Sequence, residues 1–323
     1  MNPFTKTTSE RISDWGEVQL IQQIQDFLGP ASPPPPEGIG DDAAVLSTGD
    51  AKNSVITTDG LVWNRHFDAS VTPEQAGAKL VKRNLSDLAA MGAAPDWMVL
   101  NLLLAPEVSK EWILKFISGI GESCLEYRSK LVGGDIAQAE NGTLAGFITA
   151  GGNAPRPLYR TGSQPGDSLW VTGHLGGSLR GHHLSFRPRL DEGLWLAARK
   201  EVHACMDVTD GLGKDLPALL PKRTAASLHP QSIPISPAVE SSGEQALRRA
   251  FNDGEDYELL FSLAAETNLE AFQQDWSRQF PHTPLTRIGT LLQGDFEHPF
   301  LRHPDGTPFP VQPGEGYQHL RNE

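Results

Sequence analysis

The sequence predicts an α/β fold of the α+β type, made of two successive halves. The chain has 323 residues, a length that fits two domains better than one. Short apolar runs typical of strands alternate with longer stretches whose apolar residues recur at helical spacing. After a segment rich in glycine and proline at 151–157, this order begins again. We therefore expect an N-terminal domain over residues 1–152 and a C-terminal domain over residues 153–323.

The N-terminal half opens with a predicted helix over residues 17–28. Its apolar residues fall on one stripe, formed by Val18, Ile21, Ile24 and Leu28. Gly29 and the prolines of 33–36 end the helix in a stiff loop. Strands are then predicted over 43–46 and 54–58, each beside an acidic segment.

A second helix begins at a strong start signal. Thr72 is the expected N-cap, Pro73 takes the first helical position, and Gln75 completes a capping box. The apolar stripe of this helix consists of Leu80, Val81, Leu85, Leu88 and Ala89.

Polar residues interrupt that stripe. Asn84 falls within it and Asp87 at its edge, whereas Ser86 is expected to face away. Inward polar groups need partners or a ligand, so the pair favours a site over a single buried hydrogen bond. The basic pairs 82–83 and 248–249 are most simply solvated helix faces.

The remaining elements follow from the same patterns. Helices are expected over 109–128, around 178 and 195, over 211–220 and over 269–280. Strands are expected over 131–135, 144–150, 168–172, 204–208, 257–264 and 286–291.

Composition excludes several classes of function. The formal net charge of −13 gives no basic footprint, so we expect no nucleic-acid partner. Cys124 and Cys205 are too few for a disulfide framework or a Cys-rich zinc site, and their neighbours indicate buried thiols. Residues 1–15 do not resemble a signal peptide, and no apolar stretch is long enough to span a bilayer. We therefore expect a soluble, cytoplasmic protein without a membrane partner.

Five acidic segments lie at the predicted strand ends. They are Gly40-Asp41-Asp42, Thr57-Thr58-Asp59, Gly133-Gly134-Asp135, Asp207-Val208-Thr209-Asp210 and Asp253-Gly254-Glu255-Asp256. Converging carboxylates repel one another unless a cation sits among them. Aspartate with threonine, rather than cysteine or histidine, indicates a hard ion such as Mg²⁺. The chain has no P-loop and no Rossmann fingerprint. The pattern therefore suggests phosphate chemistry in which metal replaces the phosphate-binding loop.

Each segment also has an ordinary explanation. Gly133-Gly134-Asp135 alone is a common turn, and a lone histidine such as His66 is more often structural than catalytic. Asp210 could simply cap the helix that follows it. However, Asp207 and Thr209 share one face of an extended strand. A helix cap would explain the carboxylate of Asp210 but not that of Asp207. Because a helix N-terminus also favours phosphate, we prefer a site there.

Six segments in order resemble the thiamine-monophosphate kinase family. This family belongs to the superfamily of aminoimidazole ribonucleotide synthetase and selenophosphate synthetase, and the resemblance runs from Gly16 to Tyr317. The segments are Gly-Ile-Gly-Asp-Asp-Ala-Ala-Val (38–45), Thr-Thr-Asp-Gly-Leu-Val (57–62), Asn-Leu-Ser-Asp-Leu-Ala-Ala-Met-Gly-Ala (84–93), Gly-Gly-Asp (133–135), Asp-Val-Thr-Asp-Gly-Leu (207–212) and Gly-Glu-Asp-Tyr-Glu-Leu (254–259).

The resemblance implies a PurM-like fold of two domains, each a mixed sheet with helices. It also implies a homodimer in which the N-terminal domain binds ATP and Mg²⁺ and forms the dimer contact. The implied reaction is ATP-dependent phosphorylation of thiamine monophosphate to thiamine diphosphate, by in-line transfer assisted by several Mg²⁺ ions. No catalytic residue beyond the metal ligands is implied.

The resemblance also assigns residues. The implied metal ligands are Asp42, Thr57, Thr58, Asp59, Asp87, Asp135, Asp207 and Asp210. The implied ATP contacts are Gly134, Asp135, Arg160 and Thr209. The implied thiamine-phosphate contacts are His66, Glu255 and Tyr317.

Two competing interpretations remain. A selenophosphate synthetase would need a reactive cysteine in an N-terminal glycine-rich loop, and no cysteine precedes Gly38. A non-catalytic, metal-dependent nucleotide-binding protein would fit the same motifs, although every motif aspartate is present.

Some positions depart from the family pattern. Threonine stands at 57 and 209 in place of the more usual serine, which keeps the hydroxyl. Gly60, Ile136 and the prolines of 33–36 also differ from that pattern.

Overall fold

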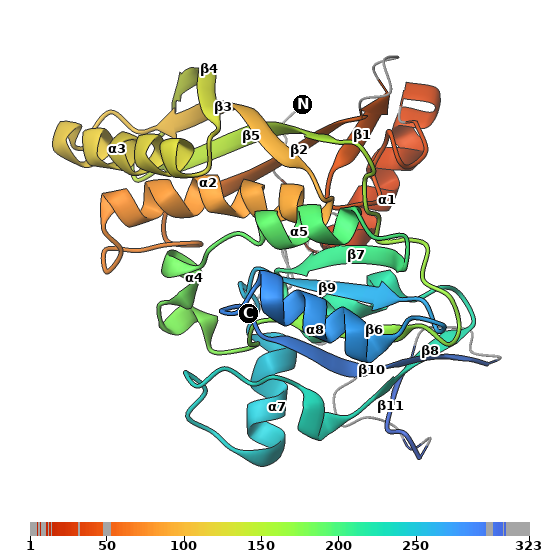
Figure 1. The fold of residues 1–323 in the computed structure, drawn as a ribbon. Coiled ribbons are helices and arrows are strands. Elements are labelled where there is room, and N and C mark those ends of the chain that lie inside the picture. The colour runs from red at the N-terminus through yellow and green to blue at the C-terminus, as the bar shows by residue number, and fades with distance from the viewer. Residues whose placement is uncertain are drawn as a thin grey trace.

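Two α/β halves lie one against the other, as the upper and lower parts of Figure 1. The structure is a computed structural model that describes residues 5, 7, 11, 13, 15–31, 33–47, 53–294, 300–305 and 307. Among these residues the N-terminal sheet has five strands and the C-terminal sheet has six, both with parallel and antiparallel pairs. The predicted α/β fold with a mixed sheet in each half is therefore confirmed.

The N-terminal sheet has the strand order β1-β2-β5-β3-β4. Its strands are β1 (Ala44–Ser47), β2 (Asn53–Val62), β3 (Ala94–Leu104), β4 (Lys130–Gln138) and β5 (Leu144–Ala154). The helices of this half are α1 (Gly16–Leu28), α2 (Pro73–Ala90) and α3 (Lys110–Glu126). Helices α2 and α3 pack side by side on one face of the sheet (Figure 1). The β3–β4 pair is parallel, and the other pairs are antiparallel.

The C-terminal sheet has the strand order β11-β8-β10-β6-β9-β7. Its strands are β6 (Ser168–Thr172), β7 (Val202–Val208), β8 (Thr224–Leu228), β9 (Glu258–Leu263), β10 (Leu285–Gln293) and β11 (Phe300–Arg302). Its helices are α4 (His182–Ser185), α5 (Leu190–Ala197), α6 (Leu212–Asp215), α7 (Gly243–Asn252) and α8 (Leu269–Gln279). Short 3₁₀ helices cover Gly29–Ala31, Ser178–Arg180, Leu216–Leu219 and Pro230–Ser232.

Helix α2 lies between the two halves. It packs against α3, β2 and β5 of its own half, and against α4, α5, β7 and β9 of the other. The predicted capping box of Thr72 and Gln75 is formed at its start. One hydrophobic cluster runs from Val55 through Leu85 to Trp276, so the core is continuous between the two halves. The division into domains at residue 152 stays a prediction.

Some predicted elements differ from the structure. Strand β5 continues to Ala154 and is paired with β2 and β3, so most of the predicted linker at 151–157 is strand. The predicted helix over 211–220 is a short α-turn followed by a 3₁₀ turn, because Pro217 has no N–H to continue an α-helix. Strands β3, β8 and β11 were not predicted, since short apolar runs do not distinguish strand from buried helix. Helix α7 was expected only as the helix face of residues 248–249, without bounds.

Lys82 and Ser86 are both buried, unlike their predicted positions on a solvated or outward face. The reason is that α2 packs on both halves of the protein. The side of this helix that faces away from the N-terminal core contacts the C-terminal half instead of water. Lys82 donates to the carbonyl oxygens of Leu184 and Phe186, at 2.8 and 3.0 Å. A buried ammonium must be paired in this way.

Glycines allow α2 and α3 to approach closely. A Cβ on Gly119 of α3 would lie 2.1 Å from the carbonyl oxygen of Glu74, and one on Gly77 of α2 would lie 2.1 Å from that of Phe116. Both obstacles are backbone atoms, which cannot move without shifting a helix. Gly121, on the same helix as Gly119, would meet no heavy atom within 4 Å.

We predict opposite effects for two alanine substitutions in α3. Gly119→Ala forces the helices apart and should lower the free energy of unfolding by about 1–3 kcal/mol. Gly121→Ala, the matched control, gains helix propensity and should be neutral or stabilising by up to about 1 kcal/mol. Urea unfolding followed by circular dichroism measures both. Equal effects of the two changes would contradict the close helix contact.

Candidate active site

Three carboxylates from separate elements meet between the halves. Asp42 precedes β1, Asp87 lies in the last turns of α2, and Asp207 lies near the end of β7. Each offers one oxygen, and these three oxygens lie within 4.8 Å of one another. Thr57 donates to Asp87 Oδ2 at 2.6 Å, and Ser86 donates to Asp207 Oδ2 at 2.5 Å. The two hydroxyls therefore orient two of the three carboxylates.

This cluster is electrostatically suited to a cation. Burial, together with the charges of Asp207, Asp59 and Asp42, raises the pKa of Asp87 well above its ordinary value. Burial and the charge of Asp42 raise the pKa of Asp207 in the same direction. Asp42 Oδ2 is buried and accepts no hydrogen bond from the described residues. Oxygen ligands alone, one of them unpartnered, fit a hard divalent ion such as Mg²⁺.

Basic side chains stand beside the predicted ligands. Arg160 contacts Asp42 through Nε at 3.1 Å and through Nη2, and its backbone N–H donates to Asp41. Arg83 Nε lies 2.7 Å from Asp59 Oδ2. The prediction that Arg83 is solvated is therefore wrong, because α2 turns this residue towards β2 and the site.

The Asp210 carboxylate pairs with Lys214 instead of capping a helix. Lys214 Nζ lies 2.6 Å from Asp210 Oδ2 and 3.0 Å from Glu17 Oε2. The backbone N–H groups of Thr209 and Asp210 both donate to Asp215 Oδ2, at 2.9 and 3.0 Å. Asp215 thus holds the backbone of the segment before α6, no side chain caps this helix, and the Asp210 side chain faces a pocket.

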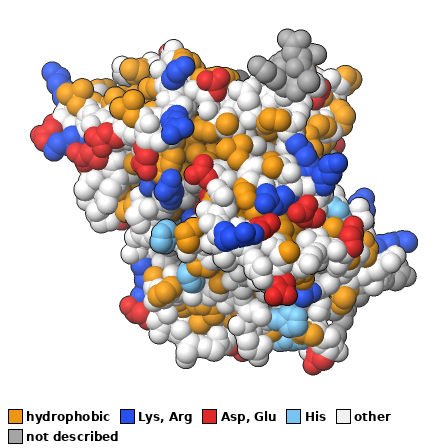
Figure 2. All heavy atoms as spheres, in the orientation of Figure 1, with side chains coloured by type: hydrophobic (Ala, Val, Ile, Leu, Met, Phe, Trp, Pro, Cys, Tyr) orange, Lys and Arg blue, Asp and Glu red, His pale blue; other side chains and the backbone are white. Residues whose placement is uncertain are grey.

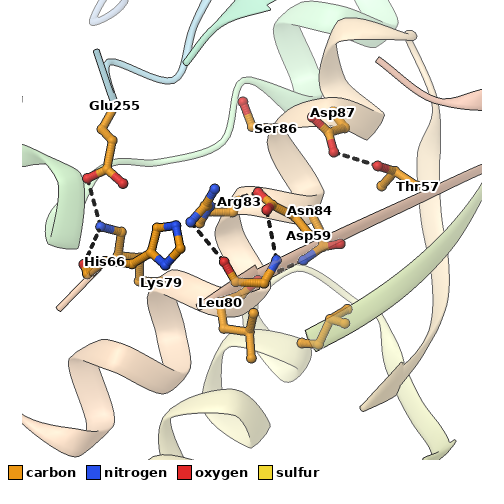
Figure 3. Close-up of polar contacts among 12 residues, drawn as sticks. Thr57, Asp59, His66, Lys79, Leu80, Arg83, Asn84, Ser86, Asp87 and Glu255 are labelled. Atoms are coloured by element: carbon orange, nitrogen blue, oxygen red, sulfur yellow. Dashed lines mark hydrogen bonds and ion pairs between the residues drawn. The ribbon is translucent and has the colours of Figure 1, made fainter. Parts of the chain in front are cut away.

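A pocket of about 290 Å³ lies beside the carboxylate cluster. Six of the residues predicted from sequence line it: Asp59, His66, Asp87, Thr209, Asp210 and Glu255. Asp253, from the fifth acidic segment, also lines it, and Arg65, Arg83, Leu179 and Tyr257, which were not predicted as site residues, complete the wall. Figure 3 shows Asp59, Asp87, His66 and Glu255 around α2, which contributes Arg83 between them. Residues from both halves therefore form one polar pocket.

Glu255 is held at one end of this pocket. Its backbone N–H donates to Thr209 O at 2.7 Å, and its Oε2 lies 2.7 Å from Lys79 Nζ and 3.1 Å from His183 Nδ1. Burial acts to raise the pKa of Glu255, but the contacts with His183 and Lys79 outweigh it and lower the pKa to about 2. Glu255 is therefore a permanently charged acceptor near neutral pH.

The structure does not bring every predicted residue to the pocket. Thr58 points to the opposite sheet face from Thr57, as strand alternation requires, and donates to Ile148 O at 3.0 Å. Gly134 and Asp135 lie within the exposed strand β4, three strands away from β2 and about 14 Å across the sheet. Gly133-Gly134-Asp135 is thus neither a turn nor a strand end, because β4 continues to Gln138. Thr57-Thr58-Asp59 also lies inside its strand, since β2 continues to Val62. The predicted contact Tyr317 lies outside the described residues.

The spacing of polar residues in α2, in addition to that of its apolar residues, could have revealed Lys79 and Arg83, which were not predicted as site residues. Lys79, Arg83 and Asp87 recur every four residues, which places them on one face of α2. The apolar stripe identified the face towards the N-terminal core. This polar stripe marks the face towards the other half, where Ser86 also lies.

Comparison with known proteins agrees with the predicted resemblance. Residues 40–154 match the model of the AIR synthase related protein N-terminal domain. The chain is 37% identical over 268 residues to thiamine-monophosphate kinase of Rhodopirellula baltica, an alignment that covers 79% of this chain and 83% of that protein. The chain belongs to the thiamine-monophosphate kinase family. A further member, from Escherichia coli K12, is 34% identical over 334 residues. That alignment covers 94% of this chain and 98% of the Escherichia coli protein.

Solved structures of this family have the same fold. A structure described as AaThiL complexed with AMPPCP and TMP superposes with a TM-score of 0.80 at 27% identity, covering 97% of this chain and all of that one. Thiamine monophosphate kinase from Aquifex aeolicus gives a TM-score of 0.73 at 26% identity, covering 90% and 97%. The predicted PurM-like fold is confirmed. No helix among the described residues is long and apolar enough to cross a membrane.

The loop that carries Glu255 also contains a buried aspartate with a high pKa. Asp256 Oδ1 accepts from the backbone N–H of Gly176 at 2.9 Å and from the hydroxyl of Ser178, whereas its buried Oδ2 has no partner among the described residues. Burial dominates and raises the pKa of Asp256 to about 8. The folded protein therefore holds Asp256 protonated at neutral pH.

We predict that Asp256→Asn makes folding less sensitive to pH. The pKa of Asp256 is raised on folding, so its contribution to stability is complete below about pH 4 and is lost as the pH rises towards about 8. Between about pH 5 and pH 8, the free energy of unfolding of the variant should rise by about 1–3 kcal/mol relative to that of the wild type. Urea unfolding measures this difference. Asp191→Asn, at an exposed position of α5, is the control. Parallel pH profiles for wild type and Asp256→Asn would contradict the assignment.

Proposed function

We propose that this protein transfers the terminal phosphoryl group of ATP to thiamine monophosphate, giving ADP and thiamine diphosphate. The observation that carries the proposal is the single pocket in which the predicted metal ligands Asp59, Asp87 and Asp210 face the predicted substrate contacts His66 and Glu255. Membership of the thiamine-monophosphate kinase family supports the same reaction. The solved relative complexed with AMPPCP and TMP supports two substrates of these kinds.

We propose Mg²⁺ as the metal. Asp42, Asp87 and Asp207 would hold an ion between the halves, and Asp59 and Asp210 would hold ions at the pocket wall. Bound Mg²⁺ would neutralise phosphate charge and align the two phosphate groups. The Thr57 and Ser86 hydroxyls, which already orient Asp87 and Asp207, would keep these carboxylates directed towards the ion.

The remaining work of the chain is positioning. The accepting phosphate of thiamine monophosphate already carries an ionised oxygen, so the reaction needs little help from a general base. Glu255 and His66 would bind the thiamine part at one end of the pocket, which leaves its phosphate directed towards the aspartates. Arg83 brings a guanidinium to the wall between these ends, and Thr209 and Arg160 would contact the nucleotide.

We also propose a homodimer. The second face of the N-terminal sheet, away from α2 and α3, presents apolar side chains that are only partly covered: Ile56, Val62, Val99, Leu103 and Phe147. Phe147, on the central strand β5, is 40% exposed. Among the residues that the structure describes, α2 and α3 cover the other face of this sheet and no helix covers this one (Figure 1); apolar side chains lie at the surface of this half in Figure 2. A sheet face of this kind is normally buried, and a second copy would bury it.

The roles of Thr58, Gly134, Asp135 and Tyr317 remain proposals that the family resemblance supports. A cytoplasmic location is also proposed, in keeping with the two free, buried cysteines Cys124 and Cys205.

The direct test is to incubate the protein with ATP, Mg²⁺ and thiamine monophosphate and to measure thiamine diphosphate by chromatography. We expect Asp59→Asn and Asp210→Asn to reduce turnover by at least about 100-fold at low Mg²⁺, because each removes a ligand charge beside the phosphates. Asp191→Asn on the surface of α5 is the matched control.

Metal binding can be followed without turnover. Mg²⁺ alone should raise the melting temperature of the wild type, since it binds only the folded cluster, and should raise that of Asp87→Asn less. Near-normal turnover of both Asp59→Asn and Asp210→Asn would reject the metal assignment. ATP binding without product would favour a non-catalytic nucleotide-binding protein. ADP formed only with another acceptor would favour a different reaction of the superfamily.

We predict that a charge at the centre of the exposed sheet face prevents dimer formation. Phe147→Asp would place a carboxylate in the proposed contact, so sedimentation velocity should show a dimer for the wild type and a monomer for the variant. Leu125→Asp is the control, because Leu125 is 81% exposed but lies on α3, away from this face. A Phe147→Asp protein that remains dimeric would place the contact elsewhere.

A further inference from the structure

Lys79 has an unusual position for a lysine. It lies in α2, its side chain has no exposed surface, and its ammonium group contacts three different segments. Nζ lies 3.2 Å from His66 O, 2.8 Å from His183 Nδ1 and 2.7 Å from Glu255 Oε2. Figure 3 shows Lys79 between His66 and Glu255. A buried ammonium is costly unless fully paired, so this one marks a specific network.

The three contacts use all three protons of the ammonium. His66 O and Glu255 Oε2 are acceptors only, and His183 Nδ1 accepts the third proton when His183 is neutral and carries its own proton on Nε2. Lys79 is therefore satisfied without water. It connects the segment after β2 in the N-terminal half to α4 and to the loop before β9 in the C-terminal half.

Glu255 depends on this network for its orientation. Its Oε2 faces Lys79 and His183, whereas its Oε1 accepts no hydrogen bond from the described residues, and 20% of the side chain is exposed at the pocket. Its backbone has φ +55°, a conformation that costs energy for a residue with a side chain. The bond from its N–H to Thr209 O and the ion pair with Lys79 together hold this conformation.

A neighbouring lysine has a different role and provides a comparison. Lys82 is also buried on α2, but its Nζ binds the carbonyl oxygens of Leu184 and Phe186. The ring of Phe186 stacks on Tyr257 with centroids 3.9 Å apart. Lys82 therefore anchors the chain around α4 without touching Glu255 or His66.

We propose that Lys79 is a positioning residue for the thiamine end of the pocket. Its ammonium fixes the backbone of His66 and the carboxylate of Glu255 relative to each other, so that Glu255 Oε1 is presented to the cationic ring portion of the substrate. The inference rests on the proposed function, and it adds a residue that neither the sequence motifs nor the family resemblance assigns.

The test compares Lys79→Met with Lys82→Met in steady-state kinetics. Lys79→Met should raise KM for thiamine monophosphate by about 10-fold or more and leave KM for ATP within about 2-fold, because it disturbs one end of the pocket. Lys82→Met, which removes another buried charge from the same helix, should raise KM for thiamine monophosphate much less. Equal effects of the two substitutions would overturn the proposal.

A pH profile separates positioning from a general loss of structure. The charged groups that face Glu255 are Lys79 and Arg83 from α2, the imidazole of His183 approaches it from α4, and Tyr257 lies on its own loop. Without Lys79 the Glu255 carboxylate loses its nearest cation and becomes easier to protonate. The ratio of KM for thiamine monophosphate in Lys79→Met to that in the wild type should then increase as the pH falls from about 8 to about 5.5. A ratio that does not vary with pH would count against the proposal.

If Lys79→Met does not fold, a double substitution can be used to test the proposal instead. Lys79→Met with Glu255→Gln removes both buried charges, so no carboxylate is left unpaired. Because Lys79 acts through Glu255 and His66, KM of the double variant should lie within about 3-fold of that of Glu255→Gln alone. A much larger increase would show that Lys79 acts in another way. If the wild type forms no thiamine diphosphate, the proposed function itself fails; if it does and these variants behave otherwise than expected, only the role of Lys79 fails.

Discussion

The burial of α2 on two sides is the constraint on which the site depends. One side of this helix packs on the N-terminal sheet and α3, and the other packs on elements of the C-terminal half. A helix in this position has no solvated face for its charged residues. Lys79, Arg83 and Asp87 must therefore find partners within the protein or in a ligand, and they do so where the two halves meet.

The same constraint explains the charge pattern around the pocket. Asp42, Asp87 and Asp207 come together from the loop before β1, from α2 and from β7, and burial raises the pKa of Asp87 and of Asp207 well above the ordinary value. Arg160, Arg83 and Lys214 each pair with one acidic side chain that was predicted to bind metal. These pairs offset part of the repulsion, and they place cations where phosphate oxygens are proposed to bind. Glu255 differs, because its own pair with Lys79 keeps it charged and directed to the pocket.

Much of the site was predictable because strand ends and helix starts have local signals. Asp42, Asp207 and Asp210 follow from such signals, whereas Asp59 lies inside β2 and not at the predicted strand end. The six ordered segments identified the family. Lys79 and Arg83 were not identified, although their spacing with Asp87 places them on one face. The second packing partner of α2 is more than 100 residues away in the chain, and nothing local specifies it.

The sequence by itself determined the fold class, the capping box of α2, the acidic segments beside β1, β7 and β9, and the kinase family. These depend on residue type and on spacing over a few positions. The tertiary structure alone decided that Thr58 and Asp135 lie away from the cluster formed by Asp42, Asp87 and Asp207. It also decided that Lys79 joins His66 to Glu255, since strand order and the contact between halves depend on long-range packing.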